Sequence, residues 1–313
     1  MNGIELSRSY YDAYGPELLS SFEDLKPFLC TGLFGSGSEC MGFDDEISRD
    51  HDFEPGFCIF VPEREEIDRK RLFQLERAYA KLPAEHAGFT RAKLSPVGGS
   101  RHGVILIPEF FTEKTGSPDG KLSLQEWLAV PEQGLLEAVN GAVFDDFYGE
   151  VSAIRERLSY YPEDIRLKKL AGHLLLMAQA GQYNYRRCIA HGEKDAAQLS
   201  AFEFVKHTIS VIFLLNRQYE PYYKWSFRAL RALPVLSLEA EVLQYLITTD
   251  NEEKMAEEKA DVIESIAADV IDELIRQGLT KANCGDLEKH AYSVEDQIAD
   301  GELRNLHILG GIA

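Results

Sequence analysis

The chain has 313 residues, of which 45% are hydrophobic and 27% are charged, an ordinary composition for a folded globular protein. It excludes an intrinsically disordered chain, a collagen and a coiled-coil rod. Acidic residues outnumber basic ones by 52 to 33, which gives a net charge of −19. Because so negative a surface repels phosphate backbones and anionic lipids, we expect neither DNA nor a membrane as a partner. A cationic small molecule would be attracted.

The five cysteines stand far apart and include no Cys-x-x-Cys pair, which argues against a zinc ribbon and a complete disulfide framework. The N-terminus lacks the apolar core of a signal peptide, and the longest apolar run, residues 209–215, is too short to span a bilayer. We therefore expect a cytoplasmic protein with reduced thiols. The sequence leaves the oligomeric state open.

The first elements in chain order mix helix and strand patterns. Residues 6–28 carry apolar side chains at helical spacing, and residues 57–61 form a short apolar run between prolines that predicts a buried strand. Residues 66–82 predict a helix, and residues 103–107 predict a second strand after a glycine-rich turn. Strand, helix and strand in this order are typical of an α/β unit.

Beyond the turn cluster at residues 116–120 the pattern becomes helical. Apolar residues at i, i+3 and i+4 spacing predict four helices, at residues 162–181, 196–217, 238–248 and 257–277. We therefore predict an α+β protein of two domains. An α/β head would comprise residues 1–120, and an all-helical C-terminal domain residues 121–313.

A glycine and serine turn is the most informative segment. It has the sequence Gly-Leu-Phe-Gly-Ser-Gly-Ser-Glu-Cys-Met-Gly at residues 32–42 and follows several apolar residues. Glycine lets backbone N–H groups approach phosphate oxygens closely, and a hydroxyl can add a further contact. A surface loop has the same composition, so the turn alone does not establish a phosphate site.

Asp50 and Asp52 follow this turn and are separated by one residue. On a strand, positions i and i+2 point to the same face, so both carboxylates could bind one hard divalent cation. Without a cation the two charges would repel each other. In so acidic a chain the alternative is a pair of exposed loop acids.

The Gly-Ser turn, the Asp-x-Asp pair and the strand that follows resemble the nucleotidyltransferase superfamily of DNA polymerase β type. This resemblance implies that Gly37-Ser38, or Gly35-Ser36 in a second register, holds the triphosphate of a nucleotide. We prefer Gly37-Ser38, with Ser36 as a further contact. The resemblance also implies that Asp50 and Asp52 bind Mg²⁺.

Two positions depart from the superfamily pattern. Members commonly have Arg-Ala-Arg-Gly after the Gly-Ser, whereas Glu39 begins the corresponding segment here and removes a possible phosphate contact. The superfamily also has a third carboxylate on a later strand, and the predicted strand at residues 103–107 offers none. Glu109 is our first candidate for this catalytic acid, and Asp145 is the second.

The helical half carries a second resemblance. Asn184, Arg187 and the segments at residues 215–217 and 221–225 are similar to bacterial domain-of-unknown-function family 4037. Aminoglycoside and lincosamide nucleotidyltransferases also carry a helical domain behind the catalytic head. Lys224, within an aromatic run, is our candidate for a further nucleotide contact, because a buried or half-buried ammonium group needs an anionic partner or water. Anchoring of a loop explains the aromatic run equally well.

The expected function is Mg²⁺-dependent transfer of a nucleoside monophosphate from an NTP to a hydroxyl group. The acceptor would be a small molecule, with a mild preference for a cationic one, or a protein. The alternative is a catalytically degenerate head that binds nucleotide and serves as an interaction module. Glu39 and the missing mid-strand acid favour this alternative, whereas Asp50 and Asp52 favour the enzyme.

Overall fold

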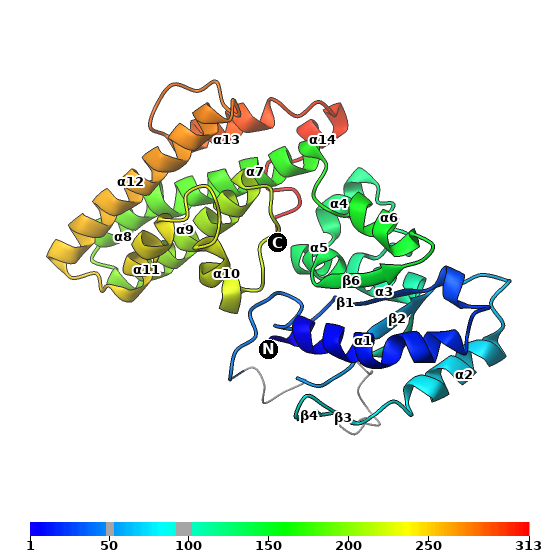
Figure 1. The fold of residues 1–313 in the computed structure, drawn as a ribbon. Helices are drawn as coiled ribbons and strands as arrows, with labels where there is room; N and C mark the ends of the chain where they lie inside the picture. The colour runs from blue at the N-terminus through cyan, green and yellow to red at the C-terminus, as the bar shows by residue number, and fades with distance from the viewer. Residues whose placement is uncertain (48–52, 92–101, 313) are drawn as a thin grey trace. The chain divides into compact units, whose positions relative to one another are not determined.

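The computed structural model describes residues 1–47, 53–91 and 102–312 (Figure 1). The chain forms two compact units. Unit one comprises Met1–Leu122 and Gln133–Ser159, and unit two comprises Ser123–Glu132 and Tyr160–Ala313. The sequence interpretation assigned residues 133–159 to the helical part, whereas the compact units place them with the sheet of unit one.

Unit one is built on a mixed four-stranded sheet with the order β5-β2-β1-β6. Strand β2 (Cys58–Val61) runs parallel to β5 (Gly103–Leu106) and antiparallel to β1 (Cys30–Leu33). Strand β6 (Ala142–Asp146) is antiparallel to β1 on the other edge. The two strands predicted from apolar runs are confirmed as β2 and β5. A separate short hairpin joins β3 (Glu85–His86) to β4 (Phe89–Thr90).

Strand β6 corrects the expectation that everything beyond residue 120 is helical. Its sequence, Ala-Val-Phe-Asp-Asp, is short and only partly buried, so it lacks the apolar run that marked β2. Its hydrogen-bonding partner is β1, far earlier in the chain, with Gly32 opposite Val143. A pairing between such distant segments leaves no local signal in the sequence.

Two helices supply apolar side chains to one face of the sheet. Helix α1 (Gly3–Ser20) ends earlier than predicted, and a 3₁₀ turn at Lys26–Phe28 leads into β1. Helix α2 (Arg69–Tyr79) is confirmed within the predicted range. The buried side chains that these helices share with the sheet are mostly aromatic and branched: Tyr10, Tyr11, Leu19, Phe57, Ile59, Val61, Leu75 and Tyr79.

The next segment of unit one turns directly from strand into helix. Strand β5 ends at Leu106, one residue earlier than predicted, and helix α3 (Ile107–Thr115) follows at once, because Pro108 suits the first turn of a helix. The Phe110 ring meets Phe34 and Phe60 edge to face at 5.2 and 5.3 Å between ring centroids. Phe34 and Phe60 stack on each other at 4.2 Å. This aromatic cluster anchors α3 beside the residues that follow β1. Helices α5 (Glu132–Val139) and α6 (Glu150–Arg157) flank β6 in sequence.

Every element described in unit two is helical. The elements are α4 (Leu124–Ala129), α7 (Glu163–Met177), a π-helical segment (Ala178–Tyr185), α8 (Arg186–Ala190), α9 (Lys194–Leu215), α10 (Tyr223–Leu230), α11 (Glu239–Thr248), α12 (Glu253–Arg276), α13 (Leu287–Glu295) and α14 (Gly301–Asn305). The predicted helices are confirmed as α7, α9, α11 and α12. Helix α7 packs against both α9 and α13 at the centre of the unit.

Helix α9 is more apolar than the sequence interpretation allowed. By length and composition alone it could cross a membrane, although most of its apolar window is buried inside the unit. A core helix of a folded domain passes the same test. Its buried side chains include Phe204, Ile209 and Phe213, which face the neighbouring helices.

Candidate functional site

The glycine and serine turn leads out of β1 and lines a cavity of about 430 Å³ in unit one. Helix α3 supplies the other wall. The cavity combines apolar, hydroxyl and charged side chains: Leu33, Phe34, Gly35, Ser36, Glu39, Cys40, Ile105, Glu109, Phe110, Glu113 and Lys114. The structure thus brings Ser36 and Glu109, two of the residues singled out from the sequence, to one cavity.

The Asn140 side chain holds the start of this turn in place. The Gly35 N–H donates to Asn140 Oδ1 at 2.8 Å, and Asn140 Nδ2 donates to the Gly35 carbonyl at 2.7 Å. Gly35 has a φ of 118°, which other residues rarely adopt. Asn140 follows α5, and sequence reasoning missed it because no local pattern connects it to the turn.

The Ser36 hydroxyl is bound by the protein itself. It donates to Glu137 Oε2 at 2.7 Å and accepts from Lys114 Nζ at 2.9 Å. Lys114 also forms ion pairs with Glu137 at 2.8 Å and with Glu113 at 2.9 Å. Ser36 therefore fixes the turn to α3 and α5, and its hydroxyl is less available to a ligand than the sequence suggested.

Burial and hydrogen bonding shift the pKa values of Glu137 and Lys114 in opposite directions. Burial raises the pKa of Glu137, but hydrogen bonds from Lys114, Ser36 and Gln133 outweigh it and leave this pKa below its usual range. Burial likewise lowers the pKa of Lys114, and its bonds to Glu137 and Glu113 more than restore it. Both groups are therefore charged near neutral pH. Lys114, the one basic side chain among the described residues that line the cavity, is already paired.

Glu39 folds back over the preferred Gly-Ser pair. Gly37 has a φ of 124°, and a Cβ added there would collide with the Glu39 carboxylate. Glu39 is only 8% exposed and also packs against Gly3 at the start of α1. The carbonyl of Ser38 accepts from the N–H groups of Met41 and Phe43, which closes the turn. The Glu39 carboxylate therefore lies close to the backbone that a phosphate would have to approach.

Asp50 and Asp52 lie outside the described residues. The described chain resumes at Phe53, whose ring lies 5.0 Å from that of Phe89, and strand β2 begins at Cys58. The placement of both carboxylates on one face of a strand therefore stays a prediction. Within residues 1–47, 53–91 and 102–312, no group of three or more His, Cys, Asp or Glu side chains is arranged to hold a metal ion.

The two candidates for the third acid have different surroundings. Glu109 is exposed in the first turn of α3 and lines the cavity. Asp145, on β6, accepts a hydrogen bond of 2.6 Å from the Tyr11 hydroxyl of α1. Burial, together with this bond to Asp145, raises the pKa of Tyr11 to about 12. Of these two candidates, Glu109 is the one that lines the cavity together with Gly35 and Ser36.

Lys224 belongs to unit two, where it occupies the first turn of α10. Its side chain is exposed, and its ammonium group lies 4.2 Å from the centroid of the Trp225 ring. The neighbouring rings of Tyr222 and Tyr223 are also exposed and lie 4.2 Å apart. A nucleotide contact by Lys224 stays a prediction.

Residues 127–226 match the family model described as domain of unknown function (DUF4037). The matched segment runs from α4 to α10 and includes β6 of unit one and the π-helical segment of unit two. No curated protein and no solved structure matches the chain. The match supports the similarity to family 4037 over this part of the chain.

Proposed function

We propose that the protein is a Mg²⁺-dependent nucleotidyltransferase, which moves a nucleoside monophosphate from an NTP to a hydroxyl group of a small-molecule or protein acceptor. One observation carries this proposal: Gly35 and Ser36, which directly precede the preferred Gly37-Ser38 pair, line the same cavity of unit one as Glu109. The order of Gly-Ser, Asp-x-Asp and strand in the sequence supports it. The net charge of −19 favours a cationic acceptor.

The charges of the cavity explain why a divalent cation is needed. Glu39, Glu109 and Glu113 line it, and the lysine among the lining residues is already paired. A triphosphate would be repelled by these carboxylates unless a cation neutralised part of its charge. Asp50 and Asp52 supply the carboxylate oxygens that Mg²⁺ prefers, and we assign the metal to them. Bound Mg²⁺ would stabilise phosphate charge and lower the pKa of the acceptor hydroxyl.

Residues of the chain itself would supply the phosphate contacts and the proton acceptor. The Gly37 and Ser38 backbone provides N–H donors for phosphate oxygens, and Ser36 keeps the turn attached to α3 and α5. As the acceptor oxygen forms its bond to the α-phosphorus, the bond from that phosphorus to pyrophosphate breaks. Glu109 takes the proton that the acceptor hydroxyl loses. Lys224 is our candidate for a further nucleotide contact.

Nucleotide binding is tested by thermal unfolding with each NTP, with and without Mg²⁺. The wild type is compared with Asp50→Asn and with Glu46→Gln, an exposed acid near the motif that serves as a matched control. A ligand at ~100 times its dissociation constant stabilises a protein by about 2.7 kcal/mol, which this assay resolves. We expect a Mg²⁺-dependent shift for the wild type and Glu46→Gln, and none for Asp50→Asn. Absence of a shift with every NTP would exclude the proposal.

The carboxylate of Glu39 over Gly37 favours a second candidate, a head that binds nucleotide without transferring it. The two candidates differ in the fate of the α-phosphate. An NTP labelled at that position would pass its label to an acceptor fraction of a cell extract if the protein is a transferase. A Mg²⁺-dependent thermal shift without any transfer of label would support the binding module instead.

A further inference from the structure

The π-helical segment Ala178–Tyr185 interrupts the long helix between α7 and α8 in unit two. Wide π turns are rare, and they occur frequently at functional sites. One side of the segment is fixed by close packing, because a Cβ at Gly181 would collide with Phe204 of α9 and would lie 2.8 Å from Ile263 of α12. Elsewhere, Gln179, Gln182, Tyr183 and Asn184 of the segment line a cavity.

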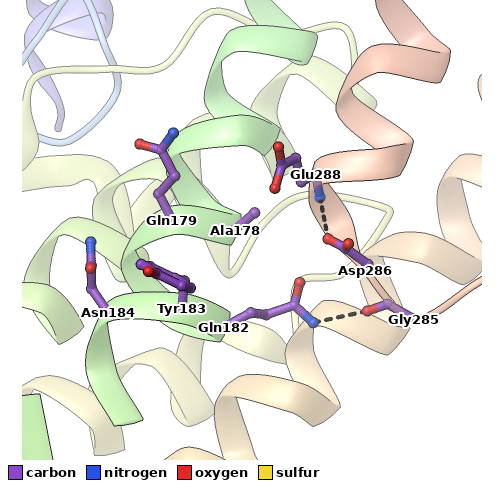
Figure 2. A pocket seen from close by; sticks show the side chains of 8 residues that line it. All are labelled: Ala178, Gln179, Gln182, Tyr183, Asn184, Gly285, Asp286 and Glu288. Atoms are coloured by element: carbon purple, nitrogen blue, oxygen red, sulfur yellow. Dashed lines mark hydrogen bonds between the residues drawn. The ribbon is translucent and has the colours of Figure 1, made fainter. Parts of the chain in front are cut away.

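A cavity of about 590 Å³ lies between this segment and the start of α13 (Figure 2). Gln182 fixes its wall. Its Nε2 donates to Glu264 and to the Gly285 carbonyl, each at 2.8 Å, and its Oε1 accepts from the Leu287 N–H at 2.9 Å. The wall is therefore formed before any ligand arrives. The remaining polar side chains around the cavity are Gln179, Tyr183, Asn184, Asp286 and Glu288.

A second cavity, of about 330 Å³, shares Gln179 and Asn184 with the first and extends to α9. Glu203 and His207 line its far part. In the part of the chain that the structure describes, the side-chain amides of Gln179 and Asn184 form no hydrogen bond with protein, and both are exposed. Each amide can therefore both donate to and accept from a ligand.

The charged side chains among the described residues that line the two cavities are acidic, although the Arg187 guanidinium lies beside the first. Asp286 and Glu288 line the first, and Glu203 lines the second, whereas neither lining contains a lysine or an arginine among the described residues. Burial lowers the pKa of His207 to about 4, so this side chain is neutral near pH 7. The Arg187 guanidinium lies 4.9 Å from the centroid of the Tyr183 ring, so this ring already has a cationic partner.

We propose that the two cavities together form a binding site for a linear aliphatic polyamine. One terminal ammonium group would pair with Asp286 and Glu288, and the other with Glu203. The amides of Gln179 and Asn184, common to both cavities, would contact the middle of the chain. Two acidic ends joined by neutral amides suit an elongated cation better than a compact one. The site is independent of the proposed transfer reaction, and its test contains no nucleotide.

Calorimetric titration of the full chain with spermidine, at fixed ionic strength, tests the site. We expect saturable binding of one spermidine, weakened about ten-fold by Glu203→Gln/Glu288→Gln because two charge pairs are lost. The matched control is Glu23→Gln/Glu257→Gln, which removes two exposed carboxylates elsewhere. This control should bind within about two-fold of the wild type, because distant exposed charges are largely screened.

Gln179→Lys gives a second, independent test. It places a cation where the two cavities meet, at an exposed position of the segment, and circular dichroism would verify that the variant is folded. We expect it to abolish spermidine binding. The proposal would be overturned by equal weakening in both double variants, which indicates only diffuse attraction to an acidic protein. Unchanged binding by Gln179→Lys, or no saturable binding by the wild type, would overturn it as well.

Discussion

The two candidate sites are both acidic, and yet their chemistry suits opposite ligands. The cavity of unit one is lined by glycine backbone and by carboxylates. Lys114, the one lysine among the described lining residues, is already paired with Glu113 and Glu137. The cavities of unit two present carboxylates and unpaired side-chain amides. We therefore expect the first to accept a phosphate only together with a metal ion, and the second to attract a cation directly. The net charge of the chain would not have distinguished these two kinds of site.

The two sites also differ in how they are held together. The turn of unit one depends on side chains far away in the sequence, Lys114, Glu137 and Asn140. In unit two, the π-helical segment supplies Gln179, Gln182, Tyr183 and Asn184 to the lining. Gln182 bridges this segment to α12 and α13. We therefore expect unit one to be sensitive to the loss of a single ion pair. The stability of unit two should instead depend on the protonation of the paired side chains His173 and His207.

The largest expected effect is acid destabilisation of unit two. His173 and His207 meet at 3.0 Å between their Nδ1 atoms, and burial lowers their pKa values to about 3 and about 4. Below pH ~6.5 the unfolded chain therefore binds more protons than the folded one, so stability is lost as pH falls. Relative to His173→Gln/His207→Gln, the wild type should lose about 2 kcal/mol per histidine between pH 7 and pH 5.

Denaturant unfolding followed by tryptophan fluorescence measures this effect, because both tryptophans, Trp127 and Trp225, lie in unit two. The double variant serves as the reference so that the titration of other groups, including Glu203 beside His207, cancels. If the free energy of unfolding changed with pH in the same way for the wild type and the double variant, the two histidines would not be the cause of acid destabilisation in unit two.

Loss of Lys114 should have the next largest effect, in unit one. Lys114→Met leaves the carboxylate of Glu137, which is 8% exposed, without its cation, and removal of one partner of a buried pair costs about 3 kcal/mol. Lys121→Met breaks an exposed pair with Asp119 and should cost less than about 1 kcal/mol. Hydrogen exchange of the β1 and β2 amides would report the stability of unit one. Equal losses in the two variants would contradict this account of the Ser36 cluster.

The third comparison is between Glu109 and Asp145, the two candidates for the proposed catalytic acid. With an acceptor fraction of a cell extract present, Glu109→Gln should slow pyrophosphate release from a saturating NTP about 100-fold while leaving nucleotide binding intact, because only proton transfer from the acceptor hydroxyl is lost. Asp145→Asn should change this rate little, since Asp145 is bound by Tyr11. The opposite pattern, with activity lost in Asp145→Asn alone, would assign the third carboxylate to β6.

The smallest effect concerns Glu39. Its carboxylate lies over Gly37, where it repels an incoming phosphate, so Glu39→Gln should tighten NTP binding about five-fold at low salt. The gain should shrink as the salt concentration rises. Calorimetric titration with Mg²⁺ and NTP, with Glu46→Gln as control, provides the measurement. Weaker binding by Glu39→Gln would mean that this carboxylate supports the ligand instead of opposing it.

The sequence predicted the elements whose patterns are local. Strands β2 and β5 were visible as apolar runs, and α7, α9, α11 and α12 as helical spacing. The Gly-Ser turn was located by composition alone. Strand β6 was missed because it depends on pairing with β1, which lies far away in the sequence. The end of β5 was misplaced by one residue because the chain turns into α3 at Ile107.

The same limit applies to the site. Asn140, Glu137 and Lys114 reach the turn through folding, and none of them stands in a recognisable motif. The helix predicted at residues 162–181 was expected to be an ordinary α-helix to its end, whereas the chain forms a π turn from Ala178 to Tyr185. Gly181, within this turn, leaves no room for a Cβ beside Phe204, a tertiary contact that single-residue propensities do not describe.

The central claim is that the Gly-Ser cavity and the Asp-x-Asp pair form one metal and nucleotide site. Electron paramagnetic resonance of Mn²⁺, substituted for Mg²⁺, tests it most directly in the presence of a non-hydrolysable NTP analogue. The account predicts that the wild type retains the Mn²⁺–nucleotide complex and that Asp50→Asn/Asp52→Asn does not. Equal retention by the two proteins, or none by the wild type, would contradict it.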